Sequence, residues 1–361
     1  MVEALTPQLS GIGRYSWELA QRLLYEPSIT QLLYRVPGRW IEDPSGLIEG
    51  RSLPRQSLWR HKTLRALRDW HDRRKLASTI VHGPNYFLPP EAEAGVITVH
   101  DLSVFKYPET HPAARIAQFE RLFRSSLDRA VRIITDTATV RDELVAFTGI
   151  SAEQVAVVPL GVSDAFHPRD VEGLRPILSR FGLAPGYGLC VSTMEPRKRI
   201  DCLIRAWAEL PRTLRDTTPL VLCGPKGWLN DKLHALIQRG QTEGWLHFLD
   251  FVAETDLPSL YAGAGLFVYP SIYEGFGLPL IEAMASGVPT IASNASCLTE
   301  VCRGAGLHVA PEDGGAFTGT IERGLTDQAW RATAVAAGLT RAASLDWQQC
   351  INRTVNVYKT L

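Results

Sequence analysis

The chain has 361 residues, of which 45% are hydrophobic and 21% charged, and its formal net charge at pH 7 is zero. This composition is typical of a soluble globular protein, and the zero net charge argues against a nucleic-acid binder that relies on overall positive charge. The length is too great for one ordinary core and predicts two domains of roughly 150–180 residues each.

The sequence also lacks the marks of a membrane-spanning or exported protein. No apolar run reaches the ~20 residues that a membrane span requires, and the N-terminus has no basic-then-apolar signal sequence. We therefore expect a cytoplasmic protein. The six cysteines include no C-x-x-C pair, and Cys190 and Cys223 lie in apolar, strand-like runs. Buried free thiols are expected rather than disulfides or zinc ligands.

A short glycine-rich stretch, GIGRY, precedes the first helical pattern of the chain. Gly11 and Gly13 come before apolar residues at helical spacing, among them Tyr15 and Leu19. A glycine-rich loop before a helix can hold a phosphate or a substrate, although two glycines fit an ordinary helix start equally well.

Residues 51–75 are strongly basic and predict an amphipathic helix. They hold nine lysines and arginines, and Trp59, Leu64, Leu67 and Trp70 recur at helical spacing. Such a helix can lie on an anionic bilayer with its tryptophans at headgroup level. A solvated helix that packs its apolar stripe on its own domain fits the pattern equally well.

Two strand-like stretches in the first half end in polar residues. Residues 81–90 read as a strand followed by a Pro/Gly/Asn loop, and residues 95–112 begin with a β-branched run that ends at His100 and Asp101. Functional side chains of α/β sheets gather where strands end. A single histidine is often structural, but the position of His100 at this strand end favours a functional role, because ligands of α/β sheets bind at such ends.

The middle of the chain continues the alternation of strands and helices. A strand ends near Thr135 and Asp136, which either reach the site with Arg141 or cap the helix that follows. Residues 174–185 are expected to form the linker into the second domain.

The second half opens with a strand, a polar loop and a helix. Arg197 and Lys198 lie in that loop, where two cations can neutralise a diphosphate leaving group, although a solvated basic turn is the alternative. The next apolar strand ends at Gly224, again at a strand terminus.

Residues 269–289, YPSIYEGFGLPLIEAMASGVP, carry the strongest signal. A strand end runs through a glycine-bearing turn into a helix, and Glu274 and Glu282 flank the turn. Gly275 and Gly277 allow close approach of a ligand, and the free N–H groups of the helix end would face an anion. The carboxylates can accept hydrogen bonds from hydroxyl groups. This combination suits a nucleotide-sugar.

Two absent motifs narrow the choice of enzyme class. There is no D-x-D triplet to hold a metal-bound diphosphate, so we expect no essential metal. There is no G-x-G-x-x-G after a strand with an acidic residue about twenty positions later, which argues against an NAD enzyme.

The 269–289 stretch resembles the donor-site signature of retaining glycosyltransferases of family 4, also called group 1. The resemblance extends over nearly the whole chain, from Gly11 to the last helix. It implies an α/β fold of the GT-B type, with two Rossmann-like domains facing a cleft. The domains are expected at residues 1–172 for the acceptor and 173–340 for the nucleotide-sugar, with a last helix in 341–361 that packs back toward the first domain.

The resemblance implies that the second domain binds the donor. Lys198 and Arg197 would hold the diphosphate, Glu274 and Glu282 would bind hydroxyls, and backbone near Phe251 and Val252 would read the base. Some relatives have an additional arginine a few residues earlier, which leaves the partner of Lys198 open. The expected donor residues are Arg197, Lys198, Gly224, Val252, Glu274, Gly275, Phe276, Gly277, Leu278 and Glu282.

On the acceptor side, the resemblance implies that His100 is an active-site histidine that hydrogen-bonds the transferred sugar. Together with Glu274 and Lys198 it forms the expected catalytic set. The expected acceptor-side residues are Gly11, Gly13, Arg14, Asn85, Tyr86 and Asp101. The family has a complete first strand before GIGRY, and here only about five residues could form it, so this strand is abbreviated or the start lies upstream.

The stretches HDLSVFKYPETHP and TMEPRKR are similar to those of mannosyl- and rhamnosyltransferases of bacterial O-antigen or exopolysaccharide assembly. A hexose donor such as GDP-mannose or GDP-rhamnose is expected, with a saccharide or lipid-linked acceptor, no cofactor, and possible peripheral contact with the cytoplasmic membrane through residues 51–75. The alternatives are a UDP-sugar donor, another enzyme on the same architecture such as an epimerase or a phosphorylase, and a catalytically silent glycan-binding subunit.

Overall fold

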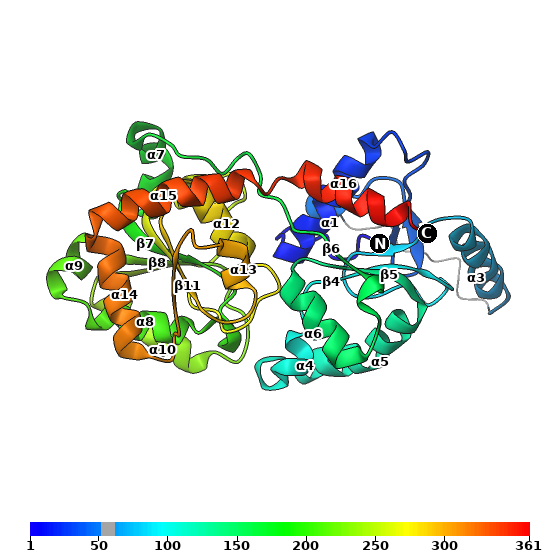
Figure 1. Cartoon of the computed structure of the whole chain (residues 1–361), viewed down its shortest axis with the longest axis horizontal. Coiled ribbons are helices and arrows are strands. Elements are labelled where there is room, and N and C mark those ends of the chain that lie inside the picture. The colour runs from blue at the N-terminus through cyan, green and yellow to red at the C-terminus, as the bar shows by residue number, and fades with distance from the viewer. Residues whose placement is uncertain (52–61) are drawn as a thin grey trace. The chain divides into compact units, whose positions relative to one another are not determined.

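A computed structural model describes residues 1–51 and 62–361, with side chains for all of these except 62–68. The chain forms two compact units, which are described separately. Unit 1 comprises residues 1–102, 114–160 and 347–361, and unit 2 comprises residues 103–113 and 161–346. Figure 1 labels the helices and strands of each unit.

Unit 1 contains a parallel sheet, a small antiparallel ribbon and surrounding helices. Its strands are β1 (Tyr34–Val36), β2 (Arg39–Ile41), β3 (His82–Gly83), β4 (Gly95–Val99), β5 (Ala130–Thr135) and β6 (Val155–Val157). Its helices are α1 (Gly11–Arg22), η1 (Leu23–Tyr25), α2 (Ser45–Ile48), α3 (Lys62–Ala77), α5 (Ala113–Arg129), α6 (Ala138–Thr148), η4 (Ala152–Gln154) and α16 (Trp347–Tyr358).

The parallel sheet of unit 1 has the order β3-β4-β5-β6, and β1 and β2 form a separate antiparallel pair. All five residues of β4 are buried, as is typical of a parallel strand covered on both faces. In register, Thr98 of β4 lies beside Ile134 of β5. The last helix, α16, contacts α1, so the C-terminal residues of the chain belong to this unit (Figure 1).

Unit 2 alternates strands and helices throughout. Its strands are β7 (Tyr187–Val191), β8 (Leu220–Cys223), β9 (Leu246–Leu249), β10 (Ala264–Tyr269), β11 (Thr290–Ser293) and β12 (Leu307–Val309). Its helices are α4 (Ser103–Lys106), η3 (Pro108–Thr110), α7 (Val171–Leu178), η5 (Ser179–Phe181), η6 (Pro196–Lys198), α8 (Ile200–Glu209), α9 (Arg212–Thr217), α10 (Asp231–Thr242), α11 (Leu257–Ala262), α12 (Leu278–Ala285), α13 (Leu298–Cys302), α14 (Gly314–Thr326) and α15 (Gln328–Ala343).

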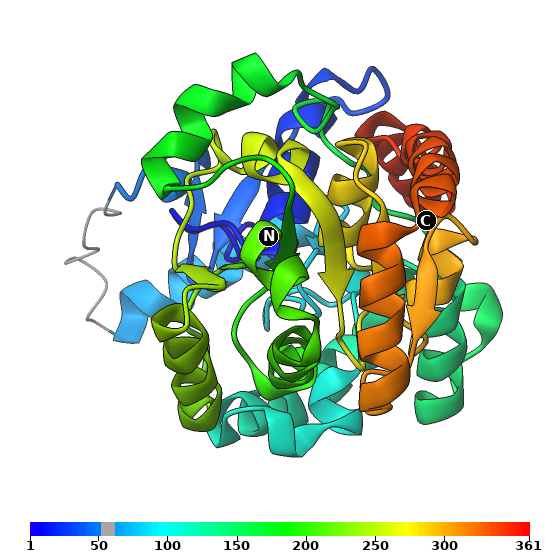
Figure 2. The same cartoon turned by 90° about the vertical axis from the view of Figure 1, so that its left-hand side faces the viewer.

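The six strands of unit 2 form one parallel sheet in the order β12-β11-β10-β7-β8-β9. The first strand, β7, therefore lies inside the sheet, with β8 on one side and β10 on the other. Helices α8, α10 and α14 pack together, and α12 packs with α11, α13 and α15. The same unit faces the viewer in Figure 2.

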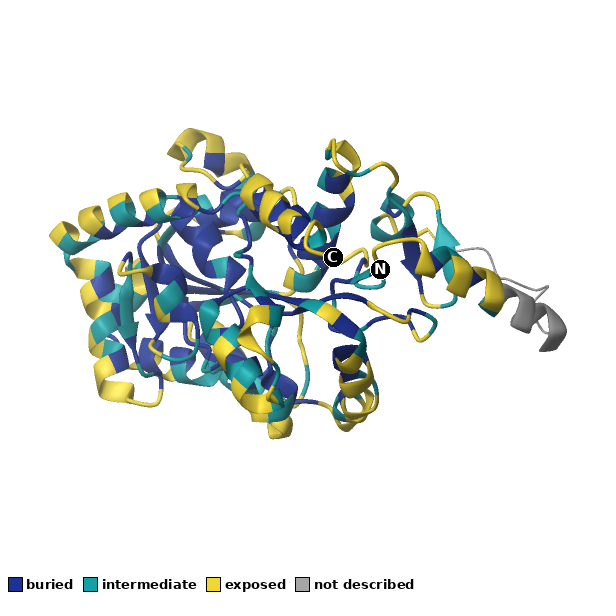
Figure 3. Ribbon diagram, turned by 45° about the vertical axis from the view of Figure 1, so that its right-hand side comes forward, coloured by how far each residue is buried: buried dark blue, intermediate teal, exposed yellow. Residues whose placement is uncertain are grey.

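The core of unit 2 lies between its sheet and its helices. Trp207 of α8 is fully buried over the sheet, and its ring occupies the space beside Gly188 of β7. Leu222 and Ile237 belong to the same apolar cluster. Figure 3 shows this pattern as dark blue strands inside and yellow outward faces on the helices. Burial of apolar side chains of this kind contributes about 25 cal/mol per Å² removed from water.

Two expectations about local structure were wrong. The stretch around Gly11 and Gly13 is not a loop, because α1 begins at Gly11 and Ser10 caps it by accepting a hydrogen bond from the Gly13 amide at 3.1 Å. Residues 174–185 are not a linker, because they contribute to α7 and η5. Leu174 and Leu178 of α7 are buried, and α7 packs on α11 in unit 2.

The expectation of free thiols was confirmed. All six cysteines are free thiols, and all but Cys202 are buried. Among the described residues, no helix combines the length and apolarity needed to cross a membrane.

The basic segment 51–75 is described only in part. Trp59 lies outside the described residues, as do the side chains of Leu64 and Leu67. In the described part of α3, Trp70 is exposed, whereas Asp72 is buried and bonds to Arg35.

Candidate donor site and the family of the chain

The polar loop after β7 carries two buried cations. The short helix η6 places Arg197 and Lys198 next to each other, and both residues are buried. Arg199 follows in a left-handed conformation, with φ of 48°, which ends η6 and starts α8. The backbone carbonyl of Arg197 accepts a hydrogen bond from the Ile272 amide at 3.1 Å. This bond ties the loop after β7 to the loop after β10.

Glu274 is the carboxylate that both cations share. The ammonium of Lys198 lies 2.5 Å from Glu274 Oε1, and Nη1 of Arg197 lies 3.5 Å from Glu274 Oε2. Arg197 also pairs with Glu195 at 2.8 Å and donates to the carbonyl oxygen of Tyr273. The Tyr269 hydroxyl accepts a hydrogen bond from Lys198 at 3.3 Å. Four charged side chains are thus held together in a buried network.

The protonation state of Glu274 follows from this network. Burial alone raises the pKa of a carboxyl group, but the charges of Lys198 and Arg197 outweigh it and hold the pKa of Glu274 below its usual value. Glu274 is therefore an anion, and the cations next to it are largely neutralised. A diphosphate would compete with Glu274 for Lys198, because both are anionic acceptors.

The turn after Glu274 brings backbone to the same place. Gly277 caps α12 with a φ of 92°, a left-handed conformation in which a side chain would be strained. A Cβ atom there would also lie 2.8 Å from the Leu298 side chain. The helix that follows has its N-terminal end at Leu278, where peptide N–H groups and the helix dipole favour an anion.

Glu282 lies one helical turn inside α12 and is buried. The negative charge of Glu282 adds to burial in raising the pKa of the buried Tyr261 hydroxyl well above its usual value. Phe276 and Leu278 are also buried, and Ser296 binds both the amide and the carbonyl of Glu274. The turn is therefore held in place from both sides.

Two further predicted donor residues follow neighbouring strands. Gly224 comes directly after β8 with a φ of 136°, and a Cβ atom there would lie 2.1 Å from the Ser192 carbonyl oxygen, so only glycine fits. Val252 follows β9 and is buried, whereas Phe251 is 51% exposed. The predicted donor residues thus all come after the carboxyl ends of β7, β8, β9 and β10.

The strand order explains why this edge suits a ligand. The chain runs from β7 to β8 and β9 on one side of the sheet, and then returns to β10 on the other side of β7. In open α/β sheets, ligands bind outside the carboxyl ends of the strands at the point where the order reverses. Lys198 follows β7 and Glu274 follows β10, so the buried ion network lies at this point.

In unit 1, His100 is part of a second buried network. Its Nδ1 lies 2.7 Å from Asp136 Oδ2, and its Nε2 lies 2.9 Å from the Pro84 carbonyl oxygen. Burial lowers the pKa of an imidazole, but Asp136 more than compensates and the pKa of His100 is raised. The Pro84 carbonyl oxygen can only accept, so Nε2 carries the proton of that hydrogen bond, while burial also raises the pKa of Asp136, the partner of Nδ1.

Two of the predicted acceptor-side residues, Tyr86 and Asp101, lie close to His100 in unit 1. Tyr86 is buried with a φ of 66°, its ring lies edge-on to His100 at 5.8 Å, and its hydroxyl accepts a hydrogen bond from the Asp101 amide. Asn85 directly precedes Tyr86. Backbone strain of this kind at a non-glycine residue clusters at functional sites.

The GIGRY residues lie in the first turn of α1. A Cβ atom on Gly13 would lie 3.0 Å from the Ala4 carbonyl oxygen, so the chain before the helix passes close to it. The Arg14 amide bonds to the carbonyl oxygen of Ser10 at 2.8 Å. Tyr15, in the same turn, lies edge-on to His100 with ring centroids 5.0 Å apart.

Residues 103–113 follow His100 in the chain and belong to unit 2. The Tyr107 ring lies 5.3 Å from the ring of Tyr273, and the Lys106 ammonium lies 5.1 Å from the same ring. The Trp228 indole donates to the Thr110 carbonyl at 2.8 Å. This segment therefore packs beside the residue that precedes Glu274.

Sequence reasoning missed two members of these networks, Glu195 and Tyr269, and left a third, Asp136, open. Of the two alternatives for Asp136, a helix cap or a place in the site, the cap is wrong, because Thr137 is the N-cap of α6 and Asp136 binds His100. Glu195 and Tyr269 were not singled out, although each borders a motif that was. Their roles depend on contacts across the sheet, for which the sequence offered no local signal.

Two family descriptions match the two halves of the chain. Residues 9–166 match the description "Glycosyltransferase Family 4", and residues 184–340 match "Glycosyl transferases group 1". The chain is 39% identical to O-antigen chain mannosyltransferase B of Escherichia coli, over 99% of this chain and 98% of that protein.

The chain belongs to the family 4, group 1 glycosyltransferases. The family resemblance drawn from the sequence is thereby confirmed.

Solved structures show the fold of this glycosyltransferase. It matches sucrose-phosphate synthase from Thermosynechococcus elongatus with a TM-score of 0.71 at 22% identity, over 98% of this chain and 94% of that one. It matches WaaG, a glycosyltransferase involved in lipopolysaccharide biosynthesis, with a TM-score of 0.70 at 16% identity, over 96% of each chain. The predicted GT-B fold class is confirmed.

Proposed function

We propose that this glycosyltransferase moves a mannosyl residue from GDP-mannose to a saccharide or lipid-linked saccharide acceptor in cell-surface polysaccharide synthesis. The observation that carries the proposal is the buried pair of cations, Arg197 and Lys198, bound to Glu274 in the turn that leads into α12, at the reversal point of the unit 2 sheet. The choice of mannose is supported by the full-length similarity to an O-antigen chain mannosyltransferase.

The donor diphosphate binds to unit 2 in this proposal. Lys198 leaves Glu274 Oε1 and binds a phosphate oxygen, and the amide groups at the start of α12 bind another. Glu274 and Glu282 then accept hydrogen bonds from hydroxyl groups of the two sugars of the donor. The remaining predicted donor residues, Gly224, Val252, Gly275, Phe276, Gly277 and Leu278, shape the pocket for the base and phosphates.

The transfer retains the anomeric configuration. The oxygen of the acceptor hydroxyl attacks the anomeric carbon from the face that the diphosphate leaves, and the bond between that carbon and the phosphate oxygen breaks. The proton of the hydroxyl passes to the departing phosphate oxygen. The negative charge that builds up on the diphosphate is stabilised by Lys198 and Arg197, which take the place that a metal ion has in other transferases. The reaction needs no metal and no cofactor.

His100 orients the transferred sugar. Its Nε2–H points at the Pro84 carbonyl, so donation to a sugar hydroxyl requires that this bond opens, while Asp136 keeps the ring charged and oriented. Asn85, Tyr86 and Asp101 border His100 and, with Gly11, Gly13 and Arg14, form the acceptor side.

A lipid-linked acceptor would bring the protein to the inner face of the cytoplasmic membrane. The described part of α3 supports such contact, because Trp70 is 58% exposed and the Arg74 guanidinium lies 5.6 Å from its ring centroid. A tryptophan flanked by arginines suits the headgroup region of an anionic bilayer.

The test is a panel of donors with a mannose-terminated oligosaccharide as acceptor. GDP-mannose, GDP-rhamnose and the common UDP-sugars are compared for transfer, with and without EDTA, and the anomeric configuration of the product is read by NMR. GDP-mannose is expected to be the best donor, the product to have the configuration of the donor, and EDTA to leave the rate unchanged.

Other outcomes separate the alternatives. Transfer only from a UDP-sugar would refute the choice of base, and an inverted product would refute the mechanism. If no nucleotide-sugar binds or reacts, the protein is a silent glycan-binding subunit. The Lys198→Met variant is assayed beside the wild type, because it keeps the length of the side chain but removes the charge that the proposed mechanism needs. Its transfer rate is expected to be much lower.

A further inference from the structure

Thr98, in strand β4 of unit 1, bonds to two residues whose rings pack against His100. It comes two positions before His100, and the alternation of side chains along a strand directs such a pair to the same face. Both residues are buried, and Thr98 has no exposed surface. The proposed reaction uses His100 but assigns no role to Thr98.

The hydroxyl of Thr98 holds the first of these rings. Its Oγ1 lies 2.9 Å from the Tyr15 hydroxyl. The Tyr15 ring meets the His100 imidazole edge-on, with an interplanar angle of 84° and ring centroids 5.0 Å apart. The energy of such a contact depends on the ring angle as well as on the distance. A Tyr15 ring that is held at its hydroxyl therefore restricts the rotation of the imidazole.

The carbonyl of Thr98 holds the second ring. It accepts a hydrogen bond from the Tyr86 amide at 3.0 Å, and the Tyr86 ring meets the imidazole at 79° with centroids 5.8 Å apart. The same bond fixes the strained backbone of Tyr86, whose φ is 66°. Pro84, whose carbonyl oxygen binds His100 Nε2, lies two residues earlier in this loop. Thr98 therefore supports two ring neighbours of His100 and one of its hydrogen-bond partners.

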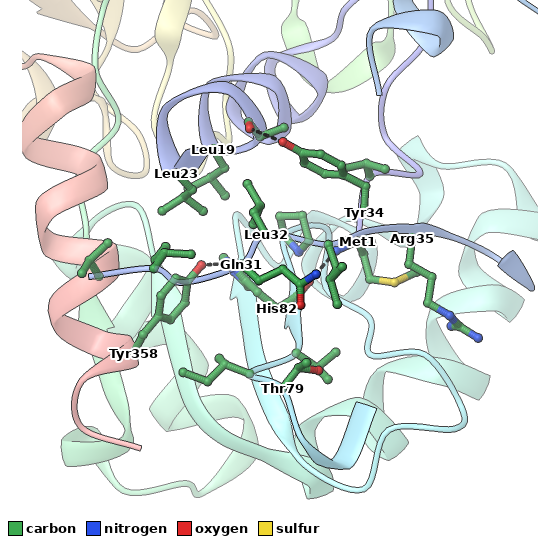
Figure 4. A pocket seen from close by; sticks show the side chains of 18 of the residues that line it. Met1, Leu19, Leu23, Gln31, Leu32, Tyr34, Arg35, Thr79, His82 and Tyr358 are labelled. Atoms are coloured by element: carbon green, nitrogen blue, oxygen red, sulfur yellow. Dashed lines mark hydrogen bonds between the residues drawn. The ribbon is translucent and has the colours of Figure 1, made fainter. Parts of the chain in front are cut away.

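A buried chain of hydrogen bonds holds the Thr98 hydroxyl in turn. His82 Nε2 lies 2.9 Å from Thr98 Oγ1, and His82 Nδ1 lies 2.7 Å from the hydroxyl of Tyr358 in α16. Figure 4 shows His82 and Tyr358 among the residues that line a pocket of unit 1. A neutral imidazole donates from one nitrogen and accepts at the other, and a hydroxyl can do both. Thr98 can therefore bond to His82 and to Tyr15 at the same time with either tautomer of His82.

We propose that Thr98 is a positioning residue for His100: its hydroxyl and carbonyl hold the Tyr15 and Tyr86 rings, and these rings fix the orientation in which the imidazole meets the transferred sugar. Thr98 acts only through these two rings and touches no reacting atom. The inference rests on the proposed function, which assigns His100 to the sugar. Misplacing an active-site group by about 1 Å can cost about 100-fold in rate, so the loss of one holding bond is measurable.

Two variants of the full chain test the hydroxyl. Thr98→Val keeps the shape of the side chain and removes the hydroxyl, whereas Thr98→Ser keeps the hydroxyl and removes a methyl group. The assay measures kcat and KM with GDP-mannose and a mannose-terminated oligosaccharide, and the Kd for GDP by calorimetry. We expect Thr98→Val to lower kcat about 10-fold or more, Thr98→Ser to stay within about 3-fold of the wild type, and the Kd for GDP to change less than about 2-fold in both.

The order of the two variants separates positioning from packing. A merely structural role predicts that Thr98→Ser is the more harmful change, because serine leaves a void in the core where valine does not. A lower kcat for Thr98→Ser than for Thr98→Val would therefore overturn the proposal. Thr354→Val is the matched control, since Thr354 is an equally buried threonine of unit 1 whose hydroxyl bonds to the Cys350 carbonyl within α16. It should leave kcat unchanged.

Tyr15→Phe breaks the same hydrogen bond from its other end and keeps the ring. It is expected to lower kcat as well. The double variant Thr98→Val/Tyr15→Phe is expected to lose little more than Thr98→Val alone, because the second change finds the bond already broken. Losses that multiply in the double variant would show that the two side chains act independently, and they would contradict the proposal.

An NMR measurement reads the His100 ring without any substrate. In protein labelled at the ring nitrogens of histidine, the signals of His100 are assigned by their absence from a His100→Gln variant, and the exchange of its N–H with water is measured. Burial and the bond to Pro84 should keep this exchange slow in the wild type. Thr98→Val should speed it about 10-fold or more, and Thr354→Val should not.

This measurement distinguishes a failure of the inference from a failure of the proposed function. Unchanged exchange in Thr98→Val would overturn the positioning role even if kcat falls. Faster exchange with an unchanged kcat would instead refute the role of His100 in the transfer, while its positioning by Thr98 would stand.

Discussion

Replacing Lys198 by methionine is the sharpest test of the donor site. The change removes the cation whose ammonium lies 2.5 Å from Glu274 Oε1 and keeps a side chain of similar length. Arg197 stays, but it is 3.5 Å from Glu274 and also bound to Glu195. The variant therefore retains one cation that is already shared.

The expected loss follows from where the charge is needed. Lys198 is 9% exposed, so water screens its charge far less than that of a surface lysine. Removing one preorganised group that stabilises charge in a transition state costs about 2.7–4 kcal/mol, or roughly 100- to 1000-fold in kcat. In the ground state the diphosphate gains less from Lys198, because it must first displace Glu274. We expect the Kd for GDP to rise less than about 10-fold.

The assay measures kcat and KM for the transfer and the Kd for GDP by calorimetry. Lys198→Arg should restore part of kcat, because it returns the charge. Lys232→Met is the matched control, since Lys232 is an exposed lysine on α10 of the same unit and should change neither constant. Unfolding midpoints show whether the variant is folded, because breaking a buried ion pair can cost about 3–5 kcal/mol. Equal losses in kcat and in GDP affinity would show that Lys198 only binds, and an unchanged kcat would refute its role altogether.

Three further predictions concern other buried groups. Glu282→Ala should weaken GDP binding by about 1–3 kcal/mol in calorimetry through the loss of a hydroxyl contact, whereas Glu322→Ala on the exposed face of α14 should not; equal affinities would remove Glu282 from the site. The pKa of His100 is raised, so its pairing stabilises the protein fully below pH 6.5 and less as pH rises through the folded pKa. Asp136→Asn should therefore cost more stability in urea unfolding at pH 6 than at pH 9, and a cost that grows with pH would contradict the pairing. Burial lowers the pKa of His82 to about 3, so the free energy of unfolding should fall as the pH drops from 6.5 toward 3. His82→Gln removes the titrating ring and should flatten that fall in urea unfolding. An equally steep fall in the variant would show that His82 does not cause it.

Local patterns were enough to single out most residues of the candidate donor site. Glu274 and Glu282 flank a turn and a helix start, and the periodicity of α12 determines that Glu282 lies one turn inside. Arg197 and Lys198 were identified because a basic loop follows a buried strand. These features depend on residues close together in the chain, where backbone geometry and capping leave a readable signal.

Some local predictions failed because a nearby residue changed the backbone. Ser10 caps α1 one residue before Gly11, so the glycines became part of the helix. The apolar spacing of Leu174 and Leu178 made a helix of a stretch that was expected to link the domains. The composition of both stretches predicted a loop or linker. The Ser10 cap in the first stretch and the buried leucines in the second stabilised a helix instead.

The sequence by itself determined the fold class, the family and the strand ends at which polar residues gather. Only the tertiary structure decided which of them meet: Lys198 and Glu274 are 76 positions apart in the chain, and His100 and Asp136 are 36 apart. The reason is physical: strand order and the burial of charge are set by contacts between distant segments, and such contacts leave no periodic signal in the residues near either partner.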